Sequence, residues 1–288
     1  MEHTSRPFSI RIFLPDGSTD GLRIVEKSNW SGRGVVCPRA VFRESKSRDE
    51  FNSTGVYVLL GPAESGSLPV VYIGQGDPVR PRMESHYGKK DFWQQAVFFV
   101  SKDDHLNKAS ISHLEARLIR LAQDAKRCTL DNSNTPVLPS LSEMDEADAE
   151  RFLDEILMCL PIVGVNVFRT PESHSRPDRQ MLELSGSGAK ATGYEAADGL
   201  VVLAGSMSRV TGANTCPDSI TALRETLLQS GVFERDGDSY RLAQDYTFSS
   251  PSQAAAVMMA RSANGRIEWS GPDGRTLKEI QEAGVNDE

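Results

Sequence analysis

Residues 55–76 read GVYVLLGPAESGSLPVVYIGQG, and this stretch decides the fold of the first half of the chain. It holds two runs of β-prone residues, Val56–Leu60 and Val70–Ile73. The residues between the two runs are mostly glycine, proline and serine, which favour turns. The sequence therefore predicts a β-hairpin with a long loop.

The segments after the hairpin predict a mixed unit. Asp77 is expected to cap a helix whose first residue is Pro78. Ala96–Val100 (AVFFV) is a third β-prone run, and apolar residues at helical spacing predict a helix from about Ser110 to Lys126. This order of elements predicts an α/β fold of the α+β kind, in which helices flank a small sheet.

Further elements are expected on both sides of this unit. Ser9–Leu14 alternates apolar and polar side chains, and Leu22–Val25 and Val35–Val41 can supply short strands, which together predict an N-terminal β extension. Ser142–Leu160 has the pattern of an amphipathic helix with an acidic face, and Ile162–Phe168 resembles a strand.

A change in composition separates the two halves of the chain. Residues 170–192 are polar and rich in serine, glycine and proline, which is typical of a linker, and the run GLVVLAG at 199–205 opens a second α+β unit. A length of 288 residues also suggests about two domains. The division that we expect is an N-terminal β extension (1–50), a central domain (51–170), a linker (171–195) and a C-terminal accessory domain (196–288).

Composition excludes several classes of protein. Lysine and arginine number 32 against 40 aspartate and glutamate, a net charge of -8 that argues against a wholly basic nucleic-acid binder. The longest apolar stretch is too short to span a bilayer, and the N-terminal residues MEHTSRPF lack the apolar core of a signal peptide. The four cysteines have neither zinc-site nor CxxC spacing. We expect a cytoplasmic protein with reduced thiols and no membrane association.

Two glycine-containing turns look like phosphate-binding loops but lack essential residues. Residues 61–68 (GPAESGSL) have no lysine after the second glycine, so this loop is rejected as a nucleotide site. In Gly74-Gln75-Gly76 the third glycine of a dinucleotide fingerprint is replaced by Val79, and the preceding strand belongs to a hairpin. A phosphate at the helix N-terminus, residues 77–80, stays open, as does a cofactor enzyme built on the Gly74 turn.

The two hairpin strands resemble a known nuclease family. Gly55-Val56-Tyr57 and Val71-Tyr72-Ile73-Gly74 are similar to the two signature tripeptides of the GIY-YIG nucleases. Arg82 and His86 follow on the predicted short helix, and Glu115 lies in HLEARLI on the long helix, at the positions that the family pattern requires. Each residue alone would be interpreted as structural, whereas the whole constellation favours a nuclease site. The resemblance covers roughly residues 55–136.

The resemblance implies a role for each of these residues in phosphodiester hydrolysis. Tyr57, made more acidic by neighbouring positive charge, would take a proton from the attacking water, and Tyr72 would orient or relay that proton. Arg82 would bind the phosphate through its guanidinium fork, and His86 would assist the proton relay. Glu115 would be the metal ligand, with Mg²⁺ or Mn²⁺ as the cofactor.

Local charge favours nucleic acid, and DNA in particular, as the partner. Between Tyr72 and Arg127 there are ten lysine or arginine residues against seven acidic ones. The residues that we expect to contact the substrate are Arg80, Lys89, Lys90, Lys108 and Asn132. A partner protein or a second copy of the chain stays open as well, because two cuts in a duplex need either two protomers or two visits.

The C-terminal part resembles the domain of unknown function 4357, a module often attached to bacterial GIY-YIG proteins. The similarity rests on FSSPSQAA (248–255), Asn264-Gly265-Arg266 with Trp269, and Asp273-Gly274. The serines before the alanine-rich segment are expected to cap a helix, and Trp269 is expected in the core.

The combined expectation is a bacterial, metal-dependent endonuclease that hydrolyses phosphodiester bonds by one-metal, tyrosine-assisted attack of water. The alternative is a catalytically inactive nucleic-acid-binding or regulatory protein on the same fold. The two are separated by whether Tyr57, Tyr72, Arg82, His86 and Glu115 converge on one place.

Overall fold

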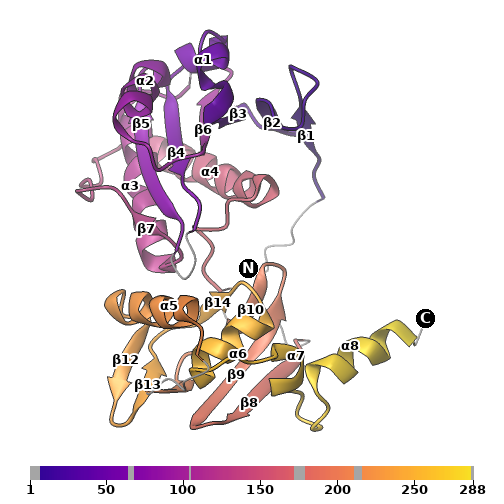
Figure 1. Cartoon of the computed structure of the whole chain (residues 1–288). Coiled ribbons are helices and arrows are strands. Elements are labelled where there is room, and N and C mark those ends of the chain that lie inside the picture. Colours follow the sequence, from indigo (N-terminus) through magenta and orange to yellow (C-terminus); the bar gives the residue numbers. More distant parts are fainter. Residues whose placement is uncertain (1–6, 64–67, 104, 172–178, 211–215, 287–288) are drawn as a thin grey trace. The chain divides into compact units, whose positions relative to one another are not determined.

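The computed structural model describes residues 7–63, 68–103, 105–171, 179–210 and 216–286 (Figure 1). The chain forms two compact units, the first made of residues 1–62 and 69–168 and the second of residues 63–68 and 169–288. Both units combine a β-sheet with helices, so the mixed fold class is confirmed. Among the described residues, no helix is long and apolar enough to cross a membrane.

The first unit is built on a seven-stranded sheet with the strand order β1-β2-β3-β6-β4-β5-β7. Its neighbouring strands are antiparallel except for β5 and β7, which are parallel. The strands are β1 (Ile10–Phe13), β2 (Arg23–Lys27), β3 (Gly32–Pro38), β4 (Gly55–Leu60), β5 (Val70–Gly76), β6 (Gln95–Ser101) and β7 (Thr129–Leu130). The predicted hairpin is therefore present as β4 and β5, although residues 64–67 of its loop lie outside the described part of the chain.

Helices cover both faces of this sheet (Figure 1). They are η1 (Arg39–Val41), α1 (Phe42–Ser45), η2 (Asp49–Asn52), α2 (Val79–Lys89), α3 (Lys108–Ala125), α4 (Glu143–Cys159) and η3 (Leu160–Val163). On one face, α3 and α4 pack on alternate residues of the hairpin, including Val56 and Ile73. On the other face, α2 and the residues after β3 pack on Tyr57 and Leu59. The period of two along each strand thus sends the tyrosines toward α2 and the valines toward α3.

The N-terminal strands belong to the same sheet as the hairpin. All seven residues of β3 pair with β6, from Gly32 opposite Ser101 to Pro38 opposite Gln95. Residues 1–50 are therefore part of the first unit and not an appendage beside it. The expected boundary at residue 50 falls within η2, between the two halves of one core.

Two local expectations are wrong. Ile162–Phe168 is not a strand, because Pro161 lies in the short helix η3 and Gly164 ends that helix with a φ of 86°. Asp77 does not cap α2, which begins at Val79, and its carboxylate instead accepts a hydrogen bond from the Thr54 hydroxyl.

The second unit contains a sheet with the order β12-β13-β11-β9-β10-β14, and β9 also pairs with β8, which pairs with β15. Its strands are β8 (Met181–Gly186), β9 (Ala189–Ala196), β10 (Gly199–Val202), β11 (Met207–Arg209), β12 (Phe233–Asp236), β13 (Ser239–Leu242), β14 (Tyr246–Phe248) and β15 (Trp269–Ser270). Its helices are α5 (Asp218–Gln229), α6 (Pro251–Met259), α7 (Gly265–Glu268) and α8 (Leu277–Asn286).

The predicted linker is too long, because β8 and β9 fill most of residues 181–195. Along this stretch apolar or small residues alternate with polar ones, as in a strand, but its many serines and glycines give it the composition of a linker. Residues 172–178 of the predicted linker lie outside the described residues. The expected cap and core residue are confirmed, since Ser250 caps α6 and Trp269 is fully buried.

We predict that residues 1–50 are required for the first unit to fold. Removing them from a chain of residues 1–171 exposes the whole edge of β6, which loses its pairing with β3. The matched chains 1–171 and 51–171 should be compared by urea unfolding, followed by far-ultraviolet circular dichroism. We expect a cooperative transition for 1–171 and none for 51–171; equal transitions would show that the N-terminal strands are dispensable.

Candidate active site

The pairing register of the hairpin brings the two signature tyrosines together. Tyr57 of β4 lies opposite Gly74 of β5, and Leu59 lies opposite Tyr72, so both tyrosines project from the same face of the sheet. Their ring centroids are 6.3 Å apart. His86 of α2 lies against both rings, with centroid distances of 5.7 Å to Tyr57 and 4.6 Å to Tyr72. Four predicted site residues thus form one cluster, since Arg82 also bonds to Tyr57.

Gly55 and Gly74 each lie so close to neighbouring atoms that a side chain would not fit. A Cβ atom on Gly74 would lie 2.4 Å from the Tyr57 hydroxyl oxygen. A Cβ atom on Gly55 would lie 2.2 Å from the backbone oxygen of Phe99 in β6. Gly74 therefore makes room for the tyrosine side chain across the hairpin, and Gly55 makes room for the neighbouring strand.

The Tyr57 hydroxyl is held by a neutral histidine and a cation. It lies 2.9 Å from His86 Nε2, and the Arg82 guanidinium donates a hydrogen bond to it. Burial, with the positive charges of Lys90 and Arg82, lowers the pKa of His86 to about 4, so its imidazole is neutral at pH 7. Because Arg82 can only donate, the arrangement that satisfies all three groups has the phenol donating to His86 Nε2.

The expectation that positive charge makes Tyr57 more acidic is wrong for the resting site. The side chain is fully buried, and burial together with Tyr72 raises its pKa above the usual value. Arg82 lowers the pKa of Tyr57, but by less than burial raises it. The phenol is therefore protonated at neutral pH in this structure.

Next to Tyr72, residues 129–132 bond to β5 at the edge of the sheet. β7 pairs with β5 only at Val70 and Val71. Beyond that point the Asn132 side chain acts as the partner of Ile73, accepting from its N–H at 3.0 Å and donating to its carbonyl at 2.8 Å. The Asn132 amide thus fixes the backbone next to Tyr72, and its predicted contact with substrate stays a prediction.

Lys90 also lies at the cluster. Its ammonium is 4.5 Å from the centre of the Tyr72 ring and forms an ion pair with Asp131. A phosphate would therefore compete with Asp131 for this cation.

Glu115 is oriented by a residue that sequence reasoning missed. Gln75, on the β5 face toward α3, donates from Nε2 to Glu115 Oε2 at 3.0 Å and to Ser112 Oγ at 2.9 Å. Lys108 in turn donates to Gln75 Oε1 at 3.0 Å. Burial raises the pKa of Glu115, and Gln75 and Arg82 oppose that rise. The strand alternation after Tyr72 could have indicated Gln75, because it places that side chain beside the glutamate.

Arg82 links the two groups electrostatically. Tyr57 raises the pKa of Arg82, and Tyr72 and Glu115 raise it further. The tyrosines and His86 thus lie together on one face of the sheet, whereas Glu115 comes from the opposite face, where its hydrogen bond is to Gln75.

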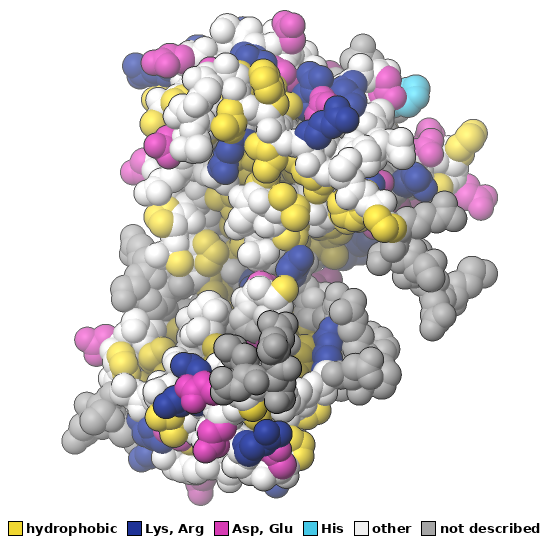
Figure 2. All heavy atoms as spheres, turned by 90° about the vertical axis from the view of Figure 1, so that its right-hand side faces the viewer, with side chains coloured by type: hydrophobic (Ala, Val, Ile, Leu, Met, Phe, Trp, Pro, Cys, Tyr) yellow, Lys and Arg dark blue, Asp and Glu magenta, His cyan; other side chains and the backbone are white. Residues whose placement is uncertain are grey.

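Arg80 and Lys89, which are also predicted to contact the substrate, lie on α2. Arg80 bonds to Glu84 one turn along α2 at 3.2 Å, and Lys46 approaches the same carboxylate at 2.8 Å. Lys89 is exposed on the last turn of α2, and its charge contributes to the lowered pKa of His86. The surface of the first unit seen in Figure 2 carries both signs of charge among exposed apolar side chains, so it is not a uniformly basic face.

The residues at Glu115 fit a weakly held, hard divalent cation. No group of three or more His, Cys, Asp or Glu that could hold a metal occurs among the described residues. A single carboxylate suits Mg²⁺ or Mn²⁺, which commonly keep water and take further oxygen ligands from a substrate phosphate. Such a cation would depend on substrate for much of its coordination.

Two cavities in the first unit lie apart from this cluster. One, of about 520 Å³, is lined by residues of α4 and by Trp30 and Leu106. The other, of about 320 Å³, lies over β1 and β2 and includes Phe13 and Arg48. Neither is lined by the tyrosines, by Gly74 or by Glu115.

Comparison with known proteins characterises the second unit. Residues 182–281 match the family described as Domain of unknown function (DUF4357). The resemblance predicted for the C-terminal part is thereby confirmed, and the match begins within β8, before the expected boundary at residue 196. No curated protein and no solved structure matches the chain.

We predict that His86 stays neutral until the pH falls to about 4. An unfolded histidine titrates near 6.5, so the stability that neutral His86 contributes is complete above about pH 6.5 and is lost as the pH falls toward 4. Its imidazole should be followed by ¹⁵N NMR from pH 7.5 to 4. The midpoint should rise in Lys90→Met and not in the exposed control Lys102→Met; a wild-type midpoint near 6.5 would contradict the prediction.

Proposed function

We propose that this protein is a metal-dependent endonuclease that hydrolyses phosphodiester bonds of nucleic acid, with DNA as the favoured substrate. The observation that carries the proposal is the cluster of Tyr57, Tyr72, Arg82 and His86, in which one phenol contacts both a neutral imidazole and a guanidinium. The resemblance of the hairpin to GIY-YIG nucleases supports the same reaction. The cytoplasmic, bacterial setting and any partner protein or homodimer belong to this proposal as well.

The proton path that we propose runs from water to Tyr57 and on to His86. The resting phenol is protonated, so it can accept a proton from water only as its own proton passes to His86 Nε2, 2.9 Å away. Burial, with the charges of Lys90 and Arg82, makes His86 a weak base in the resting site. A bound phosphodiester would offset both charges and raise the basicity of the imidazole, so substrate itself would switch the relay on.

Arg82 is the proposed phosphate ligand. It is exposed at the surface of α2 while still bonding to Tyr57, so one side chain can contact both the incoming phosphate and the proposed base. A guanidinium held in this way stabilises the negative charge that develops on the phosphate oxygens during attack.

Glu115 is the proposed metal ligand. A Mg²⁺ or Mn²⁺ ion would supply stabilisation of negative charge on the leaving oxygen. The contribution of the chain is to fix the carboxylate, since Gln75 of β5 donates to it and is itself held by Ser112, one turn earlier on α3. Asn132 fixes the strand that carries Tyr72.

A second candidate function is nucleic-acid binding without cleavage. It is favoured by the complete burial of Tyr57 and by its raised pKa, both of which oppose a role in taking a proton from water. Cleavage assays on DNA and RNA with Mg²⁺, Mn²⁺ and EDTA separate the two functions, because a pure binding protein would retain substrate without cutting it under any of these conditions.

We predict that Glu115→Gln lowers the cleavage rate by about 10²-fold or more, because it removes the proposed metal ligand while keeping the shape of the side chain. Substrate binding in EDTA should change little. The matched control is Glu146→Gln, which removes an exposed carboxylate from α4. Cleavage by Glu115→Gln at the wild-type rate would show that the metal assignment is wrong.

We also predict that Arg82→Lys lowers the cleavage rate by about 10²-fold, since lysine keeps the charge but cannot bridge the phosphate and Tyr57 with a planar fork. Arg120→Lys, an exposed position on α3, serves as the control and should be near wild type. Single-turnover rates at saturating enzyme separate this effect from weaker binding. If Arg82→Lys cleaves at the same rate as the control, Arg82 has no part in the reaction.

A further inference from the structure

The segment between β3 and β4, residues 39–53, holds the helix that carries Arg82 and His86. At the start of α2, the Val79 N–H donates to the Ser53 carbonyl at 3.1 Å. In the middle, Lys46 forms an ion pair with Glu84 at 2.8 Å. At the end of the helix, the attachment is made by Arg39.

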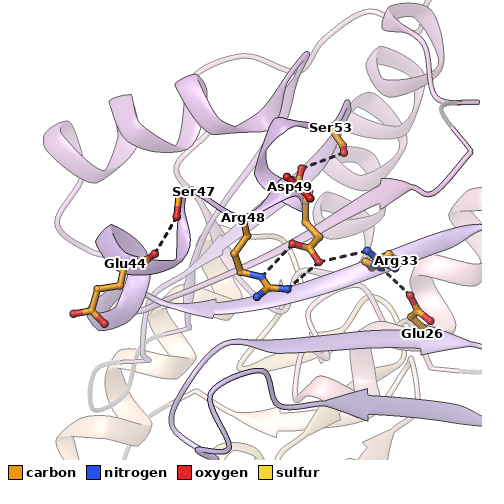
Figure 3. Close-up of polar contacts among 8 residues, drawn as sticks. Glu26, Arg33, Glu44, Ser47, Arg48, Asp49 and Ser53 are labelled. Carbon is orange, nitrogen blue, oxygen red and sulfur yellow. Dashed lines mark hydrogen bonds and ion pairs between the residues drawn. The ribbon is translucent and has the colours of Figure 1, made fainter.

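The same segment is fastened to the sheet. Arg48 bonds to both carboxylate oxygens of the buried Glu50, at 3.2 and 3.3 Å (Figure 3). Arg33 of β3 approaches Glu50 at 3.4 Å and Glu26 of β2 at 2.8 Å (Figure 3). Residues 39–53 are therefore tied to β3 through Arg33, which is itself bonded to β2, so the segment is held against the sheet.

The Arg39 side chain makes four contacts with the last turn of α2 and the residues after it. Its two terminal nitrogens donate to the carbonyl oxygens of Lys90 and Tyr87, at 2.8 and 2.9 Å. Its guanidinium carbon lies 4.5 Å from the ring centres of both Tyr87 and the fully buried Trp93. The Arg39 backbone N–H also donates to the Gln94 carbonyl at 2.8 Å.

These contacts supply hydrogen-bond donors and positive charge at the C-terminal end of α2. The last carbonyls of a helix have no partner within the helix, and the partial negative charge there favours a cation. The planar fork of Arg39 satisfies one such carbonyl, that of Tyr87, together with the carbonyl of Lys90, the residue that follows the helix. His86 belongs to this turn, where its own carbonyl accepts from the Lys90 N–H at 2.9 Å. The position of the Arg39 fork therefore sets the position of both His86 and Lys90 relative to Tyr57 and Tyr72.

We propose that Arg39 is a positioning residue of the proposed nuclease site, acting through the last turn of α2 to hold His86 against Tyr57. The inference rests on the proposed function, and it gives the N-terminal strands a part in the reaction: they carry the residue that aligns the proton relay. A purely structural Arg39 would stabilise the first unit as a whole, whereas a positioning residue affects this one turn and the reaction.

The test compares Arg39→Lys with Arg43→Lys in the full chain. Arg43 is exposed and its guanidinium lies 5.5 Å from the same Tyr87 ring, so it controls for charge and for stacking at this surface. Lysine at 39 keeps the charge but cannot bridge two carbonyls or stack as a plane. Arg39→Gln, which keeps one amide donor, is the second variant if lysine is not tolerated.

Three readouts are compared with wild type. We expect amide hydrogen exchange to increase at residues 86–90 of Arg39→Lys and to stay unchanged in β4 and β6. We expect the His86 Nε2 resonance to shift, as its hydrogen bond to Tyr57 lengthens. We expect kcat for cleavage to fall about 10-fold to 10²-fold with KM little changed, the size of effect that a displacement of about 1 Å produces. Arg43→Lys should resemble wild type in all three.

The outcomes separate this inference from the proposed function. If wild type cleaves no substrate, the proposed function fails, and exchange and the His86 resonance still decide whether Arg39 positions the turn. If exchange increases equally across the first unit, Arg39 is structural and the inference is overturned. It is equally overturned if the local exchange and the His86 resonance are unchanged, or if both change while kcat remains that of wild type.

Discussion

The register that places Tyr57 opposite Gly74 is the constraint on which the site depends. A shift of one residue would turn Tyr57 toward α3 and would bring a side chain into the space that its hydroxyl occupies. The absence of a Cβ atom at Gly74 leaves room for the phenol to cross the hairpin and reach His86. Gly74 and Tyr57 therefore meet one packing requirement together: the phenol occupies the space that a side chain at residue 74 would fill.

Burial and positive charge oppose each other at Tyr57 and act together at His86. Burial raises the pKa of Tyr57 and lowers that of His86, so both groups are neutral at pH 7 and share a hydrogen bond without an ion pair. Arg82 and Lys90 add positive charge beside them. Because burial and these cations together lower the pKa of His86, a phosphate that neutralised the cations would raise it.

Much of the first unit could be predicted from sequence, because its signals are local. The β-prone runs around Tyr57 and Tyr72 and the helical periodicity around Glu115 were enough to place all three residues on the right elements. The contacts of Arg39 and the pairing of β3 with β6 depend on residues about fifty to seventy positions apart, for which a single sequence carries no signal. Gln75 is a different case, because it lies next to the residues that resemble the nuclease family and is not one of them. Only the alternation of β5, continued past Ile73, indicates that its side chain faces Glu115. The raised pKa of Tyr57 follows from complete burial, which spacing does not show.

Exposure increases in steps from the interior of the cluster to its surface. Tyr57 and His86 are buried, Tyr72 is half-buried, and Arg82 is exposed. A phosphate from solvent would therefore meet Arg82 first and the Tyr72 side next, with Lys90 beside it. The phenol and imidazole lie behind these groups, where bulk water does not weaken their hydrogen bond and a change in nearby charge has a larger effect than at the surface. Because the helix end that carries His86 is held by Arg39 from a different part of the sheet, the buried pair can keep its geometry while the exposed groups exchange partners.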